Sequence, residues 1–392
     1  MCRPTDTSQK VNQKTYSVDS VKATSPNALK SKVPTKVYSW EEPKDSNLKV
    51  KDHFSSLLFG GSVANTLLEF VLLAAPYLAM FCFGSASLDV PGSMPFLGVA
   101  NIFLVSAIVR RVYNAYMEAV FFSFPQYRTQ PVKEHKLKRR TDLMGRDIEQ
   151  LELLDWHDKM TMISQFALNF GLYFVLPGFY PVTDESIGFV NRFVKILLNH
   201  YLLSFGMYWA HRSCHVVPYL WEKIHSIHHW AKHPLSRNTY EDHWFDNFAN
   251  AIIGHTFAQI LVPLDGPAFW FSRIFRIFES LEKHSGVSCG FNLAHSVQQW
   301  LPFAQMPHHH DWHHEGFKGS NYTFSSLGGL WDCLFGTRKV GRCSSNNWYS
   351  ATREDKSMKG EKAVGSTPLP DWFSPLYPLV GLTVAVFVKL SQ

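Results

Sequence analysis

Long apolar runs alternate with shorter polar segments along the chain, and the first runs have the length of membrane-spanning helices. Residues 62–84 (SVANTLLEFVLLAAPYLAMFCFG) match the span of about 20 predominantly apolar residues that a bilayer crossing needs. Glu69 and Pro76 interrupt this run, and a membrane helix tolerates such residues where they face other helices. The pattern predicts a first transmembrane helix.

A second apolar run, residues 94–109, ends at Arg110 and Arg111. The linker after it contains KEHKLKRR at 133–140, and such basic segments mark the cytosolic side of a membrane. The two runs therefore predict a membrane hairpin whose N-terminal tail and basic linker lie on the same side. Residues 54–190 are assigned to this hairpin and linker.

A second apolar pair, residues 160–177 and 189–210, is expected to follow. The latter contains Arg192, Lys195 and His200, so we expect it to tilt or partly leave the membrane. The remaining apolar segments are two predicted interfacial or re-entrant helices near 248–264 and 267–281, and a short run at 372–390 that packing or membrane contact explains equally well. Buried helices of a large soluble protein are the alternative, which the length and basic flank of the first hairpin disfavour.

The two ends of the chain differ from this apolar centre. Residues 1–53 are rich in Ser, Thr, Lys and Pro and lack the apolar core of a secretory signal, so they are interpreted as a disordered basic tail. Residues 341–392 form a C-terminal tail with one short apolar segment.

Composition narrows the class of protein. Of the residues, 46% are hydrophobic and 18% charged, below the roughly 25% charged residues of soluble proteins. The net charge of +6 comes from local basic segments and gives no reason to expect nucleic-acid binding. Six cysteines without a C-x-x-C pair argue against a disulfide scaffold and favour a reducing, cytosol-facing site.

Histidine is concentrated in one part of the chain: 16 of the 19 histidines lie between His200 and His314. Three groups among them have helical spacing. They are HRSCH (His211, His215), HSIHH (His225, His228, His229) and HDWHH (His310, His313, His314).

Residues three and four apart share one face of an α-helix, so each group is expected to direct its imidazoles at a common point. Imidazole suits Fe, Zn, Cu or Ni, and eight ligands are too many for one ion but about right for two ions with open positions. His200, His233, His255 and His295 are interpreted as core residues, and His308 as a loop residue before the third helix.

This pattern, HX3H, HX2HH and HX2HH, resembles the fatty acid hydroxylase/sterol desaturase superfamily of membrane di-iron oxygenases over about residues 193–338. The resemblance implies an all-α fold, an integral membrane bundle of about four spans with a cytosolic helical cap holding a histidine-rich di-metal site. It implies that residues 191–340 form a catalytic domain with two iron ions. It also implies that O2 is a co-substrate and that electrons come from NAD(P)H through a separate haem protein and its reductase.

Within this superfamily the chain looks closest to the 4-methylsterol monooxygenases. HSG at 284–286 and NYTFSSLGGLWDCLFGT at 321–337 resemble motifs of that branch. The branch implies three further candidate ligands, His243, His284 and His309. The stretch TYEDHWFDN around His243 departs from the branch, and so does a longer interval from His284 to His310.

The resemblance implies an enzyme of sterol biosynthesis in the endoplasmic reticulum membrane, multi-pass, with its site facing the cytosol. Its substrate is a lipid, most directly a 4-methylsterol, and the near alternative is squalene epoxidation by a non-flavin enzyme. A fatty acid or sphingoid hydroxylase or desaturase, a zinc-binding membrane protein and a metal transporter are further alternatives. No H-E-x-x-H or G-x-S-x-G motif supports a zinc or serine hydrolase.

Several acidic residues adjoin the candidate ligands, where carboxylates often hydrogen-bond the second ring nitrogen of a metal-bound histidine. These are Asp242, Asp246, Asp311 and Glu315. Cys214, inside the first group, is interpreted as a packing residue rather than a nucleophile.

Overall fold

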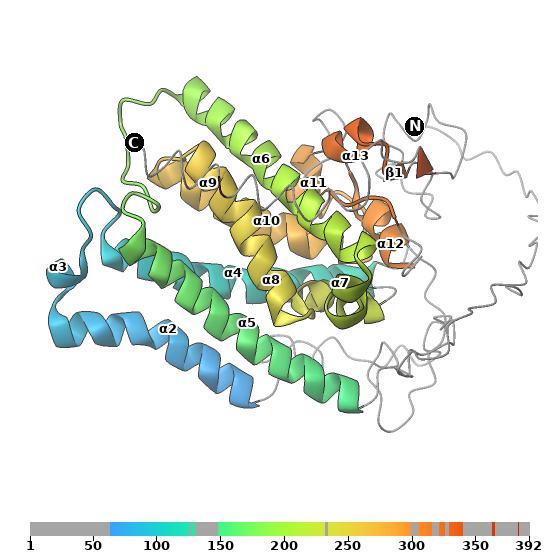
Figure 1. Cartoon of the computed structure of the whole chain (residues 1–392), viewed down its shortest axis with the longest axis horizontal. Helices are drawn as coiled ribbons and strands as arrows, with labels where there is room; N and C mark the ends of the chain where they lie inside the picture. Colours follow the sequence, from blue (N-terminus) through green and yellow to red (C-terminus); the bar gives the residue numbers. More distant parts are fainter. Residues whose placement is uncertain are drawn as a thin grey trace, which may run out of the picture. The chain divides into compact units, whose positions relative to one another are not determined.

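Three long helices near the N-terminus lie side by side (Figure 1). Helix α2 (Val63–Phe83) follows the predicted first span almost residue for residue. Gly84, at a φ of 81°, then turns the chain into the short α3 (Ser85–Leu88), and α4 (Phe96–Ser123) returns beside α2. A side chain at Gly84 would be strained in this left-handed conformation. The predicted hairpin is therefore present.

The computed structural model describes residues 63–124, 127–129, 148–231, 234–298, 305–315, 321–325, 329–339, 363–364 and 383. All of them belong to one unit, Ser39–Gln392. The predicted tail 1–53, the basic segment 133–140, His233 and, apart from residue 383, the apolar run 372–390 lie outside the described residues.

The helix that contains the predicted second span is longer than that span, because α4 continues through both arginines to Ser123. Arg110 and Arg111 instead pair with Glu69 of α2, with 2.6 Å between an Arg110 guanidinium nitrogen and Glu69 Oε1. Glu69 is only 7% exposed, and Pro76 is also buried inside α2. The two residues that interrupt the first apolar run thus face other parts of the protein, as expected.

The second predicted pair also forms longer helices than its apolar runs. Helix α5 (Ile148–Val175) begins well before residue 160, and α6 (Phe189–Val216) continues past 210 through the first histidine group. Among the helices in the described residues, α2 and α4 are long and apolar enough to cross a membrane. Two of the four expected spans therefore meet that test.

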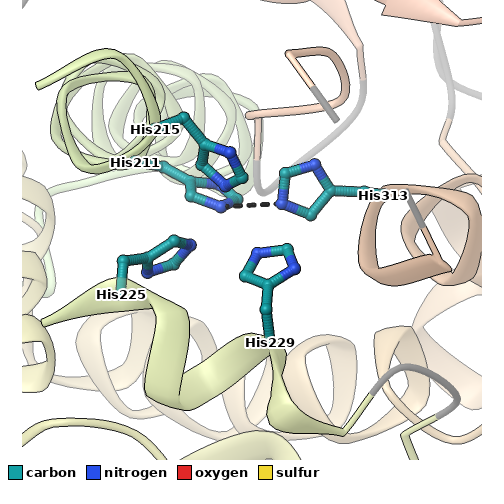
Figure 2. A group of neighbouring side chains, drawn as sticks. All are labelled: His211, His215, His225, His229 and His313. Atoms are coloured by element: carbon teal, nitrogen blue, oxygen red, sulfur yellow. Dashed lines mark hydrogen bonds between the residues drawn. The ribbon is translucent and has the colours of Figure 1, made fainter. Parts of the chain in front are cut away.

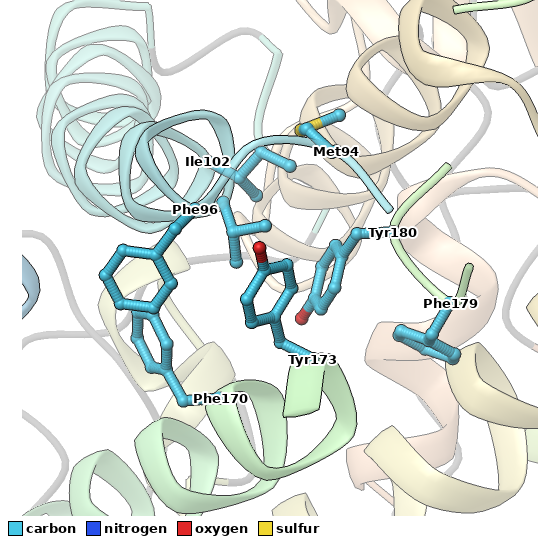
Figure 3. Close-up of a cluster of buried hydrophobic side chains, with 8 residues drawn as sticks. Met94, Phe96, Ile102, Phe170, Tyr173, Phe179 and Tyr180 are labelled. Carbon is cyan, nitrogen blue, oxygen red and sulfur yellow. The ribbon is translucent and has the colours of Figure 1, made fainter. Parts of the chain in front are cut away.

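An aromatic core joins the ends of α4 and α5 (Figure 3). Phe96 packs against Phe170 and Tyr173 with ring centroids 5.5 Å apart, and Tyr180 donates a hydrogen bond to Asn169. Large aromatic side chains contribute most of the buried area in such cores. This cluster fixes the long helices at the end away from the histidines.

A π-helical turn lies against α6 in the middle of the bundle. Helix α8 (Trp244–Asn250), the π-helix η4 (Ala251–Thr256) and α9 (Phe257–Leu261) follow one another, and a Cβ on Gly206 of α6 would lie 2.1 Å from the Ile253 carbonyl oxygen. Only glycine permits this approach. Such π-turns are frequent at functional sites.

Helix α10 (Gly266–Lys283) packs along α4 and also contacts α6, α11 and α12. The other described elements are α7 (Pro218–Lys223), η2 (His225–Trp230), η3 (Ser236–Tyr240), α11 (Leu293–Gln298), α12 (Pro307–Glu315), α13 (Leu330–Leu334), and the antiparallel pair β1 (Arg338–Lys339) and β2 (Ala363–Val364). The described part of the chain is helical apart from this pair and one isolated bridge, Arg128 with Val287.

The outward faces of the long helices are apolar. In α2, Phe70 and Phe81 are 71% and 88% exposed, and at the start of α6 Phe189 is 82% exposed. Contiguous apolar surface of this kind is unfavourable in water and typical of a face covered by lipid.

We predict that replacing Glu69 by Ala destabilises the hairpin by about 1–2 kcal/mol, because two partly exposed arginines would then lose an ion-pair partner that joins α2 to α4. Thermal unfolding in detergent micelles measures this effect. Leu67→Ala is the matched control, since Leu67 is 61% exposed on the same helix. Equal unfolding temperatures for both variants would contradict the role assigned to Glu69.

Candidate metal centre

The first histidine group lies at the end of α6, where the helix passes out of its apolar stretch. His211 and His215 are one turn apart, and their ring centroids are 5.2 Å from each other. Both side chains point to the same side of the helix (Figure 2). The expected α-helical arrangement is present here.

The spacing of the second group predicted an α-helix, but this group does not lie on one. Residues 225–230 form the 3₁₀-helix η2, directly after α7. His225 and His229 turn toward α6, whereas His228 turns to the other side, toward His284. The expectation that each group serves one common point is therefore wrong for this group.

The third group lies on α12, which begins with Pro307, so His308 is helical and not a loop residue. His310 and His314 contact one set of imidazoles, and His313, between them in sequence, contacts the other. This group is also divided between two points.

Nine histidines consequently form two clusters whose candidate ligand atoms lie within 4.8 Å of one another in each cluster. The five-histidine cluster is His211, His215, His225, His229 and His313 (Figure 2). The four-histidine cluster is His228, His284, His310 and His314. All eight histidines of the three groups are included, together with His284 of the HSG motif.

Hydrogen bonds fix the tautomers of two rings in the five-histidine cluster. His211 Nδ1 lies 3.1 Å from the Phe324 carbonyl oxygen, and His313 Nδ1 lies 2.7 Å from that of Tyr322. A carbonyl oxygen only accepts, so each Nδ1 holds the proton and each Nε2 of a neutral ring holds a lone pair. Yet the two Nε2 atoms are 3.0 Å apart.

Two lone pairs at that distance repel, unless a cation lies between them. Protonation of the rings would remove the repulsion, but burial, and next the neighbouring His225, lower the pKa of His313 well below its usual range. The contact is therefore a geometry for sharing a metal ion and not an ordinary hydrogen bond.

The four-histidine cluster follows the same rule. His284 Nδ1 donates to the Ser280 carbonyl oxygen at 2.9 Å, and His314 Nδ1 donates to that of Ala231 at 3.0 Å. The Nε2 atom of each neutral ring therefore carries a lone pair. His310 Nε2 lies 2.9 Å from His284 Nε2 and 3.2 Å from that of His314. Burial lowers the pKa of His228 to about 4, which keeps this ring neutral as well.

Unsatisfied nitrogens also fit a metal. Both ring nitrogens of His215 and Nε2 of His225 are buried without a hydrogen-bond partner among the described residues. Buried polar atoms are almost always paired, so such atoms need a partner of another kind. A set of neutral imidazoles suits iron, zinc, copper or nickel, and it disfavours magnesium and calcium, which prefer oxygen.

One of the four predicted carboxylate partners contacts a cluster histidine. Asp246 Oδ2 accepts from His225 Nδ1 at 2.5 Å, and Asn250 donates to its other oxygen. Burial would raise the pKa of Asp246, but His225, His228 and His243 together outweigh it, and the pKa is lowered. Asp246 therefore remains an anion that orients His225.

The other three carboxylates have different surroundings. Asp242 accepts from Asn247, and burial, then the charge of Asp246, raise the pKa of Asp242 well above its usual range. Asp311 accepts from Thr129, and the side chain of Glu315 lies outside the described residues. Cys214 Sγ lies 3.9 Å from Asp246 Oδ1 in a partly buried position, consistent with a packing residue.

Two of the three additional candidate ligands are not brought into the clusters. His243 precedes α8, accepts from the Phe245 backbone N–H, and its ring stands 4.2 Å from that of His157. His309 Nδ1 bonds to the Met306 backbone, and its ring packs on His308. Neither ring therefore belongs to a histidine cluster.

The histidines interpreted as core residues behave as such where they are described. His200 bonds to Ser272 at 2.9 Å, and His295 bonds to the buried Glu282 at 2.6 Å. His255 lies in η4 and lines a cavity beside Arg273. None of the three belongs to a described histidine cluster.

One cavity adjoins the clusters, and a second cavity meets the first. An inner chamber of about 130 Å³ is lined by His211 and His225 of one cluster and by His228, His284 and His310 of the other. An apolar cavity of about 290 Å³ lies between α2, α4 and α5, with Leu72, Leu73, Phe103, Ala107 and Phe166 among its walls.

The two cavities share six lining residues, which we call the neck. These are Met207, Tyr240, Asn247, Asn250, Arg276 and Ser280. The neck connects the space between the candidate membrane helices with the space beside the histidines. Sequence patterns do not reveal it, because its residues come from four separate elements.

Comparison with known proteins identifies the class. Residues 196–337, a segment that includes both clusters, match the model of the fatty acid hydroxylase family, so this segment is similar to that family.

Individual relatives are distant. The chain is 31% identical to methylsterol monooxygenase 1-3 of Arabidopsis thaliana, over 42% of this chain and 55% of the relative. It is 30% identical to methylsterol monooxygenase 2-2 of the same plant, over 45% and 66%. It is 32% identical to a very-long-chain aldehyde decarbonylase of Oryza sativa subsp. japonica, over 34% and 42%. The chain thus spans about half the length of the curated relatives it matches, and no solved structure matches it.

We predict that His228→Ala and His229→Ala each remove one metal ion, and that the two ions lost come from different clusters. The two residues are neighbours in sequence but lie in separate clusters. Metal analysis of the purified variants measures the loss, and the double variant should retain none. His308→Ala is the control, because its ring packs outside both clusters. Full metal content in either single variant would contradict the assignment.

We predict that Asp246→Asn weakens metal binding to the five-histidine cluster about 10- to 100-fold, since the anion that orients His225 is lost. Competition with a chelator, followed by metal analysis, measures this affinity. Asp242→Asn is the matched control, because Asp242 bonds to Asn247, and an amide oxygen at this position still accepts that bond. If both variants bind metal alike, Asp246 does not act on the ligand.

Proposed function

We propose that this protein is a membrane-bound di-iron oxygenase that oxidises a lipid of sterol biosynthesis, most directly a methyl group of a 4-methylsterol. O2 is its co-substrate, and electrons come from NAD(P)H through a separate haem protein and its reductase. The proposal places it in the endoplasmic reticulum membrane with its site facing the cytosol.

The observation that supports this proposal most strongly is the pairing of two imidazole clusters around one inner chamber. Nine imidazole ligands are distributed five and four, so each cluster suits one ion. His211 and His228, from different clusters, both line the chamber, so one small molecule reaches both ions there. A single structural zinc needs four ligands in all.

The nine histidines would hold the two irons, which supply the activation of O2 when they are bound. The protein's own residues have other tasks. Asp246 and the backbone carbonyls of Phe324, Tyr322, Ser280 and Ala231 fix the orientation of the rings. The burial of the clusters excludes bulk water, and the neck admits the substrate from the apolar cavity.

Support for a sterol substrate comes from two sources. The relatives in Arabidopsis thaliana are named methylsterol monooxygenases, and the family segment contains both clusters. The apolar cavity also lies between α2 and α4, the helices that are able to cross a membrane, so a lipid has a route to it from the bilayer.

We predict that expression in a yeast strain lacking sterol 4-methyl oxidation restores growth and removes the accumulated 4-methylsterols. Lipid extraction and mass spectrometry measure these sterols. His313→Ala, which removes a ligand of the five-histidine cluster, should abolish the rescue while the protein remains in the membrane fraction.

A strain lacking squalene epoxidation is the counterpart of this test. Rescue of that strain alone would overturn the proposed substrate and would favour epoxidation. Oxygen consumption by the reconstituted protein separates either outcome from a non-redox zinc protein, which would consume none.

A further inference from the structure

The neck differs in chemistry from the cavity that leads to it. Five of its six residues, Tyr240, Asn247, Asn250, Arg276 and Ser280, are polar. The walls contributed by α2 and α4 include the apolar side chains of Leu72, Leu73, Phe103 and Ala107, beside Ser106 and the paired Glu69 and Arg110. A purely hydrocarbon substrate would form no hydrogen bonds with a polar neck, and its binding would remove water from the polar side chains of the neck.

Several polar groups of the neck lack a partner. Arg276 is only 4% exposed and pairs with Glu279, yet its Nε has no hydrogen-bond partner among the described residues. Asn250 Oδ1 is equally unsatisfied, although its Nδ2 donates to Asp246 at 2.9 Å. The hydroxyl of Tyr240 makes no hydrogen bond within the described part of the chain.

Ser280 completes this set at the metal side. Its hydroxyl lies 3.4 Å from a terminal nitrogen of Arg276, and its carbonyl oxygen accepts from His284 Nδ1 of the four-histidine cluster. One residue therefore lines the neck and orients a candidate metal ligand. A group bound at the Ser280 hydroxyl lies beside the inner chamber.

We propose that the neck binds an oxygen of the lipid substrate, a hydroxyl group on the carbon next to the one that bears the methyl group to be oxidised. This inference rests on the proposed function and specifies its substrate as a lipid alcohol. Tyr240 and Ser280 are specificity-determining residues in this account, and Arg276 presents its unsatisfied Nε–H to the same oxygen. In a 4-methylsterol, the 3-hydroxyl adjoins the carbon that bears the methyl group.

The inference separates the two lipid classes left open by sequence. A sterol alcohol satisfies donors and acceptors in the neck that squalene, a hydrocarbon, leaves unpaired. Sites built to hydrogen-bond a substrate hydroxyl reject the analogue that lacks it.

The test is equilibrium binding in the absence of O2, which needs no turnover. A radiolabelled 4-methylsterol is displaced from the detergent-solubilised, metal-loaded protein by the unlabelled sterol or by its 3-deoxy analogue. We expect the alcohol to bind at least about tenfold more tightly than the deoxy analogue. Tyr240→Phe and Ser280→Ala should reduce this ratio toward one by weakening the binding of the alcohol alone.

Arg273→Gln is the matched control. Arg273 lines the same 290 Å³ cavity beside His255. Both residues also line a third pocket, and neither lines the inner chamber. The ratio should be unchanged in this variant. If Arg273→Gln removes the preference, or if the neck variants weaken both ligands equally, the hydroxyl does not bind in the neck and the inference is wrong.

The proposed function fails in a different way. If the neck variants change the ratio as expected but the wild type forms no oxidised sterol with O2 and reductant, the binding site stands and the reaction is wrong. If the wild type oxidises the deoxy analogue as well as the alcohol, the reaction stands and the neck inference is overturned.

Discussion

The repulsion between buried imidazole lone pairs is the constraint on which the arrangement of the site depends. Rings with Nδ1 bound to carbonyl oxygens present only lone pairs at Nε2, and His211 and His313 bring two of these to 3.0 Å. Burial disfavours protonation, so a metal cation is the partner that turns this repulsion into binding. The helices around the site serve to hold those rings at that distance.

The fold provides this positioning through pairs of elements that approach closely. Gly206 allows α6 to approach the π-turn η4, and α8, directly before that turn, contains Asp246 and so orients His225. Helix α10 ends at Lys283, so that His284 follows as its C-terminal cap and enters the four-histidine cluster. The same helix presents Arg276 and Ser280 to the neck, which ties substrate access to the metal centre.

Much of this was predictable from sequence where the determinant is local. The apolar run 62–84 predicted the helix found as α2, and the spacing of His211 and His215 predicted that both lie on one face of a helix, as they do in α6. Spacing could not show that η2 is a 3₁₀-helix, nor that the neighbours His228 and His229 serve different clusters, because tertiary contacts decide both.

Other differences have similar causes. Helix α4 continues past Arg110, and Glu69, on another helix, pairs with the two arginines. His284 was implied by a family motif and lies in a cluster, whereas His243 and His309, implied in the same way, do not. The backbone carbonyls that fix the tautomers have no sequence pattern, since every residue has one.

X-ray absorption spectroscopy of the iron-loaded protein tests the central claim most directly, because it reports the atoms around each ion. The account predicts two irons per chain, each with a first shell dominated by nitrogen and with the outer-shell scattering of imidazole rings. An oxygen-dominated shell typical of carboxylate ligands, or a single iron per chain, would contradict it.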